Sequence, residues 1–113
     1  MHEYSIVCSL LERVGAEARA RNATAVHRLT VRIGAAAGVE PELLSKAYEH
    51  FRAGTICAGA ELRVECVAER WACPGCGRTL QRGGILSCEG CGMSARLMSG
   101  DEIILERIEM EVP

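Results

Sequence analysis

The hydrophobic positions near the start of the chain repeat at helical spacing. From Tyr4 to about Arg21, apolar side chains recur every three or four residues, at Val7, Leu10, Leu11, Val14 and Ala18. Charged residues occupy most of the positions between them. This segment therefore predicts an amphipathic helix with one buried face.

A second helix is predicted from Pro41 to about Phe51. Proline suits the first turn of a helix, because the N–H that it lacks has no partner there. Apolar residues then follow at helical spacing, and Gly54 offers a stop shortly after the last of them. The small residues of 34–38 precede this helix and indicate a loop.

Alternating apolar and polar residues predict strands at 26–33 and 61–67, and a last strand is predicted from 102 to about 111. In the last strand the apolar positions slip from Ile103 and Leu105 to Ile108 and Met110, which indicates a bulge near Glu106 or a strand end buried on both faces. The helix between the first two strands favours a parallel crossover. A long insertion before the third strand most easily returns the chain antiparallel. We therefore expect an α+β fold, with a mixed three-stranded sheet, two helices packed on it, and an inserted zinc-ribbon-like module.

Composition fits a small globular protein. The chain has 113 residues, of which 49% are hydrophobic and 25% charged, enough for one core and unlike a disordered chain. No apolar run is long enough to cross a bilayer, and the first residues lack the pattern of a secretory signal. We expect a cytoplasmic protein that makes no membrane contact, as a monomer or a weak homodimer.

Two Cys-x-x-Cys pairs with eleven residues between them are the strongest chemical signal in the chain. This spacing is typical of a tetrathiolate zinc site. A glycine directly after each pair permits the positive φ that lets both thiolates point at one ion. Four thiolates fill a tetrahedral zinc, so the predicted site is structural. Its ligands are Cys73, Cys76, Cys88 and Cys91.

The cysteine module interrupts the predicted sheet without ending it. We therefore expect residues 1–69 together with 100–113 to form one α/β domain, and 70–99 to form an inserted zinc-binding domain. Metal would hold a segment that has too little apolar surface to fold alone. The other three cysteines, Cys8, Cys57 and Cys66, have apolar neighbours and are assigned to core packing.

Two other function classes use the same cysteines. The formal charge of the chain is −2, but residues 70–99 contain four arginines and one glutamate, a net +3, which keeps a nucleic-acid-binding zinc ribbon as an alternative. Trp71 is the only aromatic residue there for base stacking. A thiol redox enzyme would use the first pair, but a metal-bound thiolate is not a free nucleophile. No catalytic triad, carboxylate pair or phosphate loop stands out, so we do not expect an enzyme.

The N-terminus offers a second metal site. The imidazole Nδ1 of His2, its backbone nitrogen and the α-amino group can close fused chelate rings around one ion, and Glu3 can complete the set. Planar nitrogen ligation suits Ni²⁺ or Cu²⁺ better than tetrahedral Zn²⁺. The alternative is that His2 is an exposed surface residue and that Glu3 favours the positive end of the helix that follows.

The start Met1-His2-Glu3-Tyr4-Ser5, the spaced cysteine pairs and the closing strand from Gly100 resemble the HypA/HybF family of hydrogenase nickel-incorporation proteins over essentially the whole chain. The resemblance implies a nickel metallochaperone for [NiFe]-hydrogenase and, in some organisms, urease. Implied partners are a HypB-type GTPase, the hydrogenase large-subunit precursor and urease maturation proteins, with no nucleic acid. The implied metals are Ni(II) as cargo and Zn(II) as a structural ion.

The resemblance also implies roles for individual residues. His2 would be the essential nickel ligand and Glu3 a supporting one, and Glu40 falls where relatives place an acidic residue implicated in nickel binding. The alternative for Glu40 is a carboxylate at a helix N-terminus. Relatives with a histidine beside their cysteine pairs differ from this chain, which has Gly77 and Gly92 there, so we expect a plain four-cysteine site. Met98 is assigned to packing.

Overall fold

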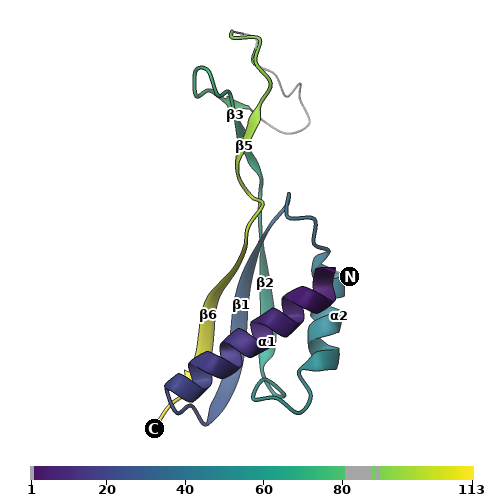
Figure 1. Ribbon diagram of the computed structural model, residues 1–113, viewed down its shortest axis with the longest axis vertical. Helices are drawn as coiled ribbons and strands as arrows, with labels where there is room; N and C mark the ends of the chain where they lie inside the picture. The colour runs from purple at the N-terminus through teal and green to yellow at the C-terminus, as the bar shows by residue number, and fades with distance from the viewer. Residues whose placement is uncertain (1, 81–87, 89) are drawn as a thin grey trace. The chain divides into compact units, whose positions relative to one another are not determined.

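The computed structural model describes residues 2–80, 88 and 90–113, without the side chain of His2 (Figure 1). Its internal contacts form two compact units. The first consists of Met1–Arg32, Val39–Glu65 and Ile104–Pro113, and the second of Ile33–Gly38 and Cys66–Ile103.

The predicted helices and main strands are confirmed, with ends that differ by one or two residues where they differ at all. Two short strands and one of four residues, not predicted individually, lie in the cysteine module. The elements are α1 (His2–Ala20), β1 (Ala25–Gly34), α2 (Pro41–Phe51), β2 (Glu61–Val67), β3 (Arg70–Ala72), β4 (Thr79–Leu80), β5 (Arg96–Ser99) and β6 (Ile103–Glu111).

β1 is the central strand of a sheet with the order β2-β1-β6. Arg28 contacts Glu61 near the starts of β1 and β2, and the Ala35 N–H donates to the Val67 carbonyl where both strands end. The two strands therefore run parallel, as expected for a helical crossover.

β6 runs antiparallel to β1 on its other side. The Thr24 N–H donates to the Glu111 carbonyl (2.8 Å), so the start of β1 lies beside the end of β6. At the other end, the Gly34 N–H donates to the Glu102 carbonyl (2.9 Å). The sheet is therefore mixed, as predicted.

One face of this sheet carries the core. The buried side chains come from α1, from alternate positions of β1 and from α2: Val7, Leu10, Val14, Ala18, Leu29, Val31, Leu44 and Tyr48. The helices also contact each other, and the rings of Tyr4 and Phe51 meet edge to face with centroids 4.8 Å apart. Burial of apolar area supplies most of the stability of such a unit.

The other face of β1 is charged. Arg28 lies 3.1 Å from a Glu61 oxygen on β2 and 3.6 Å from a Glu109 oxygen on β6, and Arg32 lies 3.7 Å from Glu106. These pairs tie the central strand to both neighbours. Each is partly exposed, so each contributes little to stability on its own.

The chain after α2 is fixed by a buried hydrogen bond. The Tyr48 hydroxyl donates to the Ala60 carbonyl (2.9 Å), and Arg52 donates to the same oxygen (2.8 Å). Cys57 lies in the enclosed turn and is fully buried, as expected.

The assignment of the two other unpaired cysteines to the core is wrong, because Cys8 and Cys66 are exposed. Cys8 follows Val7 on α1 and points away from the buried stripe. Cys66 lies near the end of β2, which is an edge strand.

The returning chain approaches β1 very closely inside the second unit. A methyl group on Gly34 would overlap the Gly100 carbonyl, and one on Gly100, whose φ is 101°, would overlap Glu69. The Gly100 carbonyl accepts from Ala36 N–H (2.7 Å). Glycine at 34 and 100 is therefore required by space and, at 100, also by backbone conformation.

The cysteine module contains its own antiparallel sheet, in the order β4-β3-β5. Trp71 of β3 lies opposite Leu80 of β4 and Leu97 of β5. These strands are short, and their side chains are exposed or half-buried. Within the described part of the chain, no helix is long and apolar enough to cross a membrane.

The adjacent leucines of α2 provide a test of the core. Leu44 is 0% exposed and Leu43 is 51% exposed. Leu44→Ala should lower the free energy of unfolding by about 2–5 kcal/mol because it leaves a cavity. Leu43→Ala should change it by about 0.5 kcal/mol or less. Urea unfolding followed by helical circular dichroism measures both, and equal losses would contradict the described burial.

Alkaline unfolding tests the buried phenol. Burial raises the pKa of Tyr48 well above its ordinary value. The neutral phenol therefore adds stability that is complete below the pKa of the unfolded state, about 10, and is lost as the pH rises beyond it. The free energy of unfolding should fall more steeply above about pH 10 in the unsubstituted protein than in Tyr48→Phe. Parallel pH profiles would show that this ionisation is not linked to folding.

Candidate metal centres

Each cysteine pair lies in a tight turn closed by its own backbone. The Gly77 N–H donates to the Cys73 carbonyl (2.8 Å), and the Gly92 N–H donates to the Cys88 carbonyl (2.6 Å). Both glycines have positive φ, 76° and 68°. The turns therefore use the glycines as predicted, and each turn directs two sulfurs to one side.

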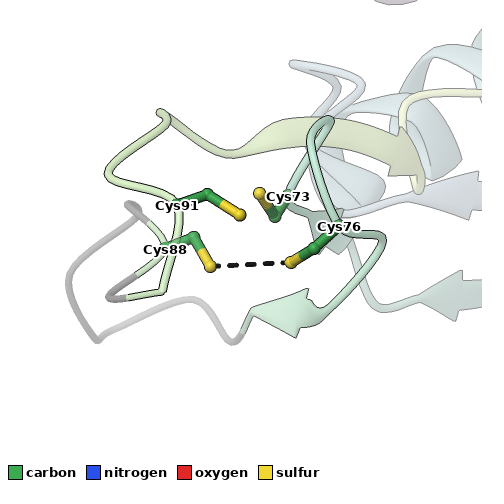
Figure 2. A group of neighbouring side chains, drawn as sticks. All are labelled: Cys73, Cys76, Cys88 and Cys91. Atoms are coloured by element: carbon green, nitrogen blue, oxygen red, sulfur yellow. Dashed lines mark hydrogen bonds between the residues drawn. The ribbon is translucent and has the colours of Figure 1, made fainter.

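The four sulfurs converge on one point (Figure 2). All four Sγ atoms lie within 4.8 Å of one another, and those of Cys76 and Cys88 are 3.7 Å apart. A tetrahedral zinc with Zn–S bonds of about 2.3 Å needs sulfurs about 3.8 Å apart. Cys73, Cys76, Cys88 and Cys91 therefore fit a four-coordinate zinc without rearrangement of the backbone.

The electrostatics of the cluster also favour a cation. Backbone N–H groups, that of Cys76 before that of Gly75, lower the pKa of the Cys73 thiol to about 7. Hydrogen bonding to Cys76 and Cys73, with burial and their negative charge, raises the pKa of Cys91 to about 12. Four sulfurs this close cannot all ionise by themselves, and a divalent ion removes that penalty.

The cysteines of the cluster differ in burial, and one neighbouring residue differs from its predicted role. Cys73 and Cys88 are buried and Cys76 and Cys91 are exposed. Met98 is 56% exposed, so its assignment to packing is wrong. Two charged residues on which the nucleic-acid alternative depends, Arg82 and Glu89, lie outside the described residues.

The N-terminal candidates approach the start of α2. The Glu40 N–H donates to Oε2 of Glu3 (3.4 Å), across 37 positions of sequence. Glu40 is the N-cap residue of α2, and its own side chain makes no capping hydrogen bond. The Glu3 carboxylate accepts from the N–H of the N-cap residue, the contact that the N3 glutamate of a capping box makes within one helix. The His2 side chain lies outside the described part, so its place beside them stays a prediction.

Sequence reasoning missed the direct contact between Glu3 and Glu40. It also started the first helix at Tyr4, whereas α1 begins at His2. One signal was present: the third residue of α2 is Leu43, so this helix start has no capping-box glutamate or glutamine to accept from the Glu40 N–H. Such a start invites an acceptor from elsewhere in the chain.

Comparison with known proteins supports one family. The sequence profile described as "Hydrogenase/urease nickel incorporation, metallochaperone, hypA" matches residues 1–110. A hydrogenase maturation factor HypA from Aquifex aeolicus is 39% identical over 114 residues, which cover 99% of each chain. The HypA of Wolinella succinogenes is 40% identical over 114 residues, covering 98% of this chain and 96% of that one.

Solved structures agree in fold over the same length. The solution structure of the Ni metallochaperone HypA from Helicobacter pylori matches with a TM-score of 0.73 and 26% identity, covering 98% of both chains. A second solution structure of a HypA protein gives a TM-score of 0.78 and 28% identity, covering 97% of this chain and 96% of that one. The chain therefore belongs to the HypA family of hydrogenase and urease nickel-incorporation metallochaperones.

Proposed function

We propose that this chain binds one Ni(II) at its N-terminus and delivers it during maturation of a [NiFe]-hydrogenase, or of urease where that enzyme is present. His2 is the principal ligand, with Glu3 and Glu40 in support. The observation that carries the proposal is the Glu3–Glu40 hydrogen bond, which joins two of the three proposed residues in a chain of this family. We propose a carrier role for the chain and no enzymatic activity.

Ligand chemistry explains how such a site selects nickel. The imidazole of His2, its backbone nitrogen and the terminal amino group are nitrogen donors within two residues. Deprotonated nitrogens in a plane favour Ni²⁺ over Zn²⁺, whereas ordinary nitrogen and carboxylate sites hold the two ions with more similar strength. Glu3 can keep Glu40 N–H on Oε2 and offer Oε1 to the ion. A divalent cargo would then gain a nearby carboxylate without unfolding the start of α2.

The position of the site suits transfer. Ligands at a chain terminus can be replaced one at a time by those of a recipient, so nickel need not be released into solution. The proposed recipients and partners are a HypB-type GTPase, the hydrogenase large-subunit precursor and urease maturation proteins. We place this exchange in the cytoplasm.

The proposed zinc site has a structural role in the cysteine module. Cys73, Cys76, Cys88 and Cys91 would hold Zn(II), and the spacing of their sulfurs fits this ion. Such a zinc would link the two cysteine turns and have no catalytic role, because four thiolates leave no position for water or substrate. We also propose that 70–99 act as an inserted zinc domain and that 1–69 with 100–113 act as the nickel domain.

The nickel site is tested by equilibrium dialysis of the zinc-loaded protein with Ni²⁺. Protein with its native N-terminus should bind one equivalent. His2→Ala, and a variant extended before Met1, should lose this binding because each removes nitrogen donors. Glu40→Ala keeps the backbone N–H that Glu3 accepts and removes the proposed supporting carboxylate, so it should weaken binding by ~10- to 100-fold. Glu42→Ala, at an exposed acid on the first turn of α2, is the matched control. Nickel binding that is indifferent to His2 would overturn the site.

Zinc removal tests the structural role of the cysteines. Cys88→Ser should lower bound zinc from one equivalent to a fraction, because a hydroxyl is a poor replacement for a thiolate ligand. Amide hydrogen exchange in β3 and β5 should then speed up, while α1 and α2 keep their protection. Cys8→Ser removes an exposed thiol and should leave both measurements unchanged. Full zinc occupancy in Cys88→Ser would contradict the assignment.

A further inference from the structure

The two cysteine turns are copies of one another in backbone as well as in sequence. Each reads Cys-x-Gly-Cys-Gly and continues with one long side chain, Arg78 after the first and Met93 after the second. The Cys73 N–H donates to the Arg78 carbonyl (2.9 Å), and the Cys88 N–H donates to the Met93 carbonyl (2.9 Å). Arg78 and Met93 therefore occupy equivalent positions, one in each turn.

The side chains of these two residues cross over to the opposite turn. A methyl group placed on Gly75 would lie 2.7 Å from Sδ of Met93. One placed on Gly90 would lie 3.9 Å and 4.0 Å from the two terminal guanidinium nitrogens of Arg78. Gly75 and Gly90 are not among the residues with positive φ. At Gly75 the glycine therefore serves to leave room for the opposite side chain, and at Gly90 the opposite side chain lies just over it.

The same two methyl positions also lie near the sulfurs, so each crossed side chain shares a neighbouring glycine with the cluster. The methyl position on Gly75 is 3.6 Å from Sγ of Cys91 and 3.7 Å from Sγ of Cys73, and the one on Gly90 is 3.9 Å from Sγ of Cys88. Met93 thus approaches the cluster with an uncharged thioether and Arg78 with a permanent positive charge. Arg78 and Met93 therefore occupy equivalent positions in the two turns, but only Arg78 carries a charge.

That difference matters because zinc held by four thiolates keeps a net charge of about −2. A nearby cation lowers the electron density that the sulfurs offer to an electrophile, and a positive charge favours the thiolate form that the metal needs. Arg78 contributes this charge from an exposed side chain, whose guanidinium lies beside Gly90 of the second turn.

We propose that Arg78 stabilises the metal centre by its charge. Its guanidinium, beside Gly90, partly compensates the negative charge of the zinc-bound thiolates. It thereby slows attack on the sulfurs by electrophiles and the loss of zinc that follows. This inference rests on the proposed zinc site. Met93 shares the steric part of the role, by covering Gly75, and lacks the electrostatic part.

The test is the rate of alkylation of full-length, zinc-loaded protein by iodoacetamide. Each reacting sulfur forms a bond to the reagent's carbon and expels iodide, and the freed zinc is measured with a chromophoric chelator. Arg78→Met keeps a long side chain and copies the second turn, and it should release zinc ~3- to 10-fold faster. Arg78→Lys should restore most of the protection. The difference should shrink in 1 M salt, because screening weakens a charge effect and leaves packing unchanged.

Arg70→Met is the matched control. It removes the same charge from β3, three residues before Cys73 and so about 10 Å away along the strand, and it should react like the unsubstituted protein. Equal rates for Arg78→Met and Arg70→Met would overturn the proposal, and so would an Arg78→Lys rate as fast as that of Arg78→Met. Complete loss of zinc from Arg78→Met alone would support it. Zinc content before alkylation separates the two claims: unsubstituted protein without zinc would refute the zinc site itself.

Discussion

The structure depends on closing a long excursion of the chain. β2 ends at Val67 and β6 begins at Ile103, and β6 must return to pair with β1. Bringing such distant ends together costs chain entropy, and the short strands of the module make too few contacts to offset this loss. Two features meet this cost: four sulfurs arranged for one ion, and a glycine-lined passage at Gly34 and Gly100 where backbones approach too closely for any side chain.

The proposed nickel site depends on how well the N-terminal segment is ordered before nickel binds. A chain terminus is normally poorly ordered, which suits cargo exchange but gives little selectivity. Here α1 begins at His2, and the Glu3 carboxylate accepts a hydrogen bond from the Glu40 N–H at the start of α2. Glu3 and Glu40 thus lie in folded segments that are already joined by a hydrogen bond. Less ordering would be needed when nickel binds, and the terminus itself would still be open to a recipient.

Much of the fold could be predicted because local patterns and tertiary packing agree. α2 and β2 have the predicted bounds, since Pro41 sets a clear helix start and the apolar alternation of 61–67 matches a half-buried strand. Cys8 and Cys66 could not be assigned correctly from their neighbours, because burial depends on which face a partner covers. The sulfur cluster followed from spacing alone. The Glu3–Glu40 contact and the crossed Arg78 and Met93 side chains needed coordinates, because each joins residues whose proximity no sequence period predicts.

The central claim is that nickel binds to nitrogen and oxygen donors at the N-terminus while the cysteines hold zinc. X-ray absorption at the nickel edge, on zinc-loaded protein with its native N-terminus and one equivalent of Ni²⁺, tests this most directly. We predict scattering from nitrogen and oxygen neighbours that includes an imidazole, with no sulfur. Nickel–sulfur scattering, or an unchanged spectrum in His2→Ala, would contradict the account.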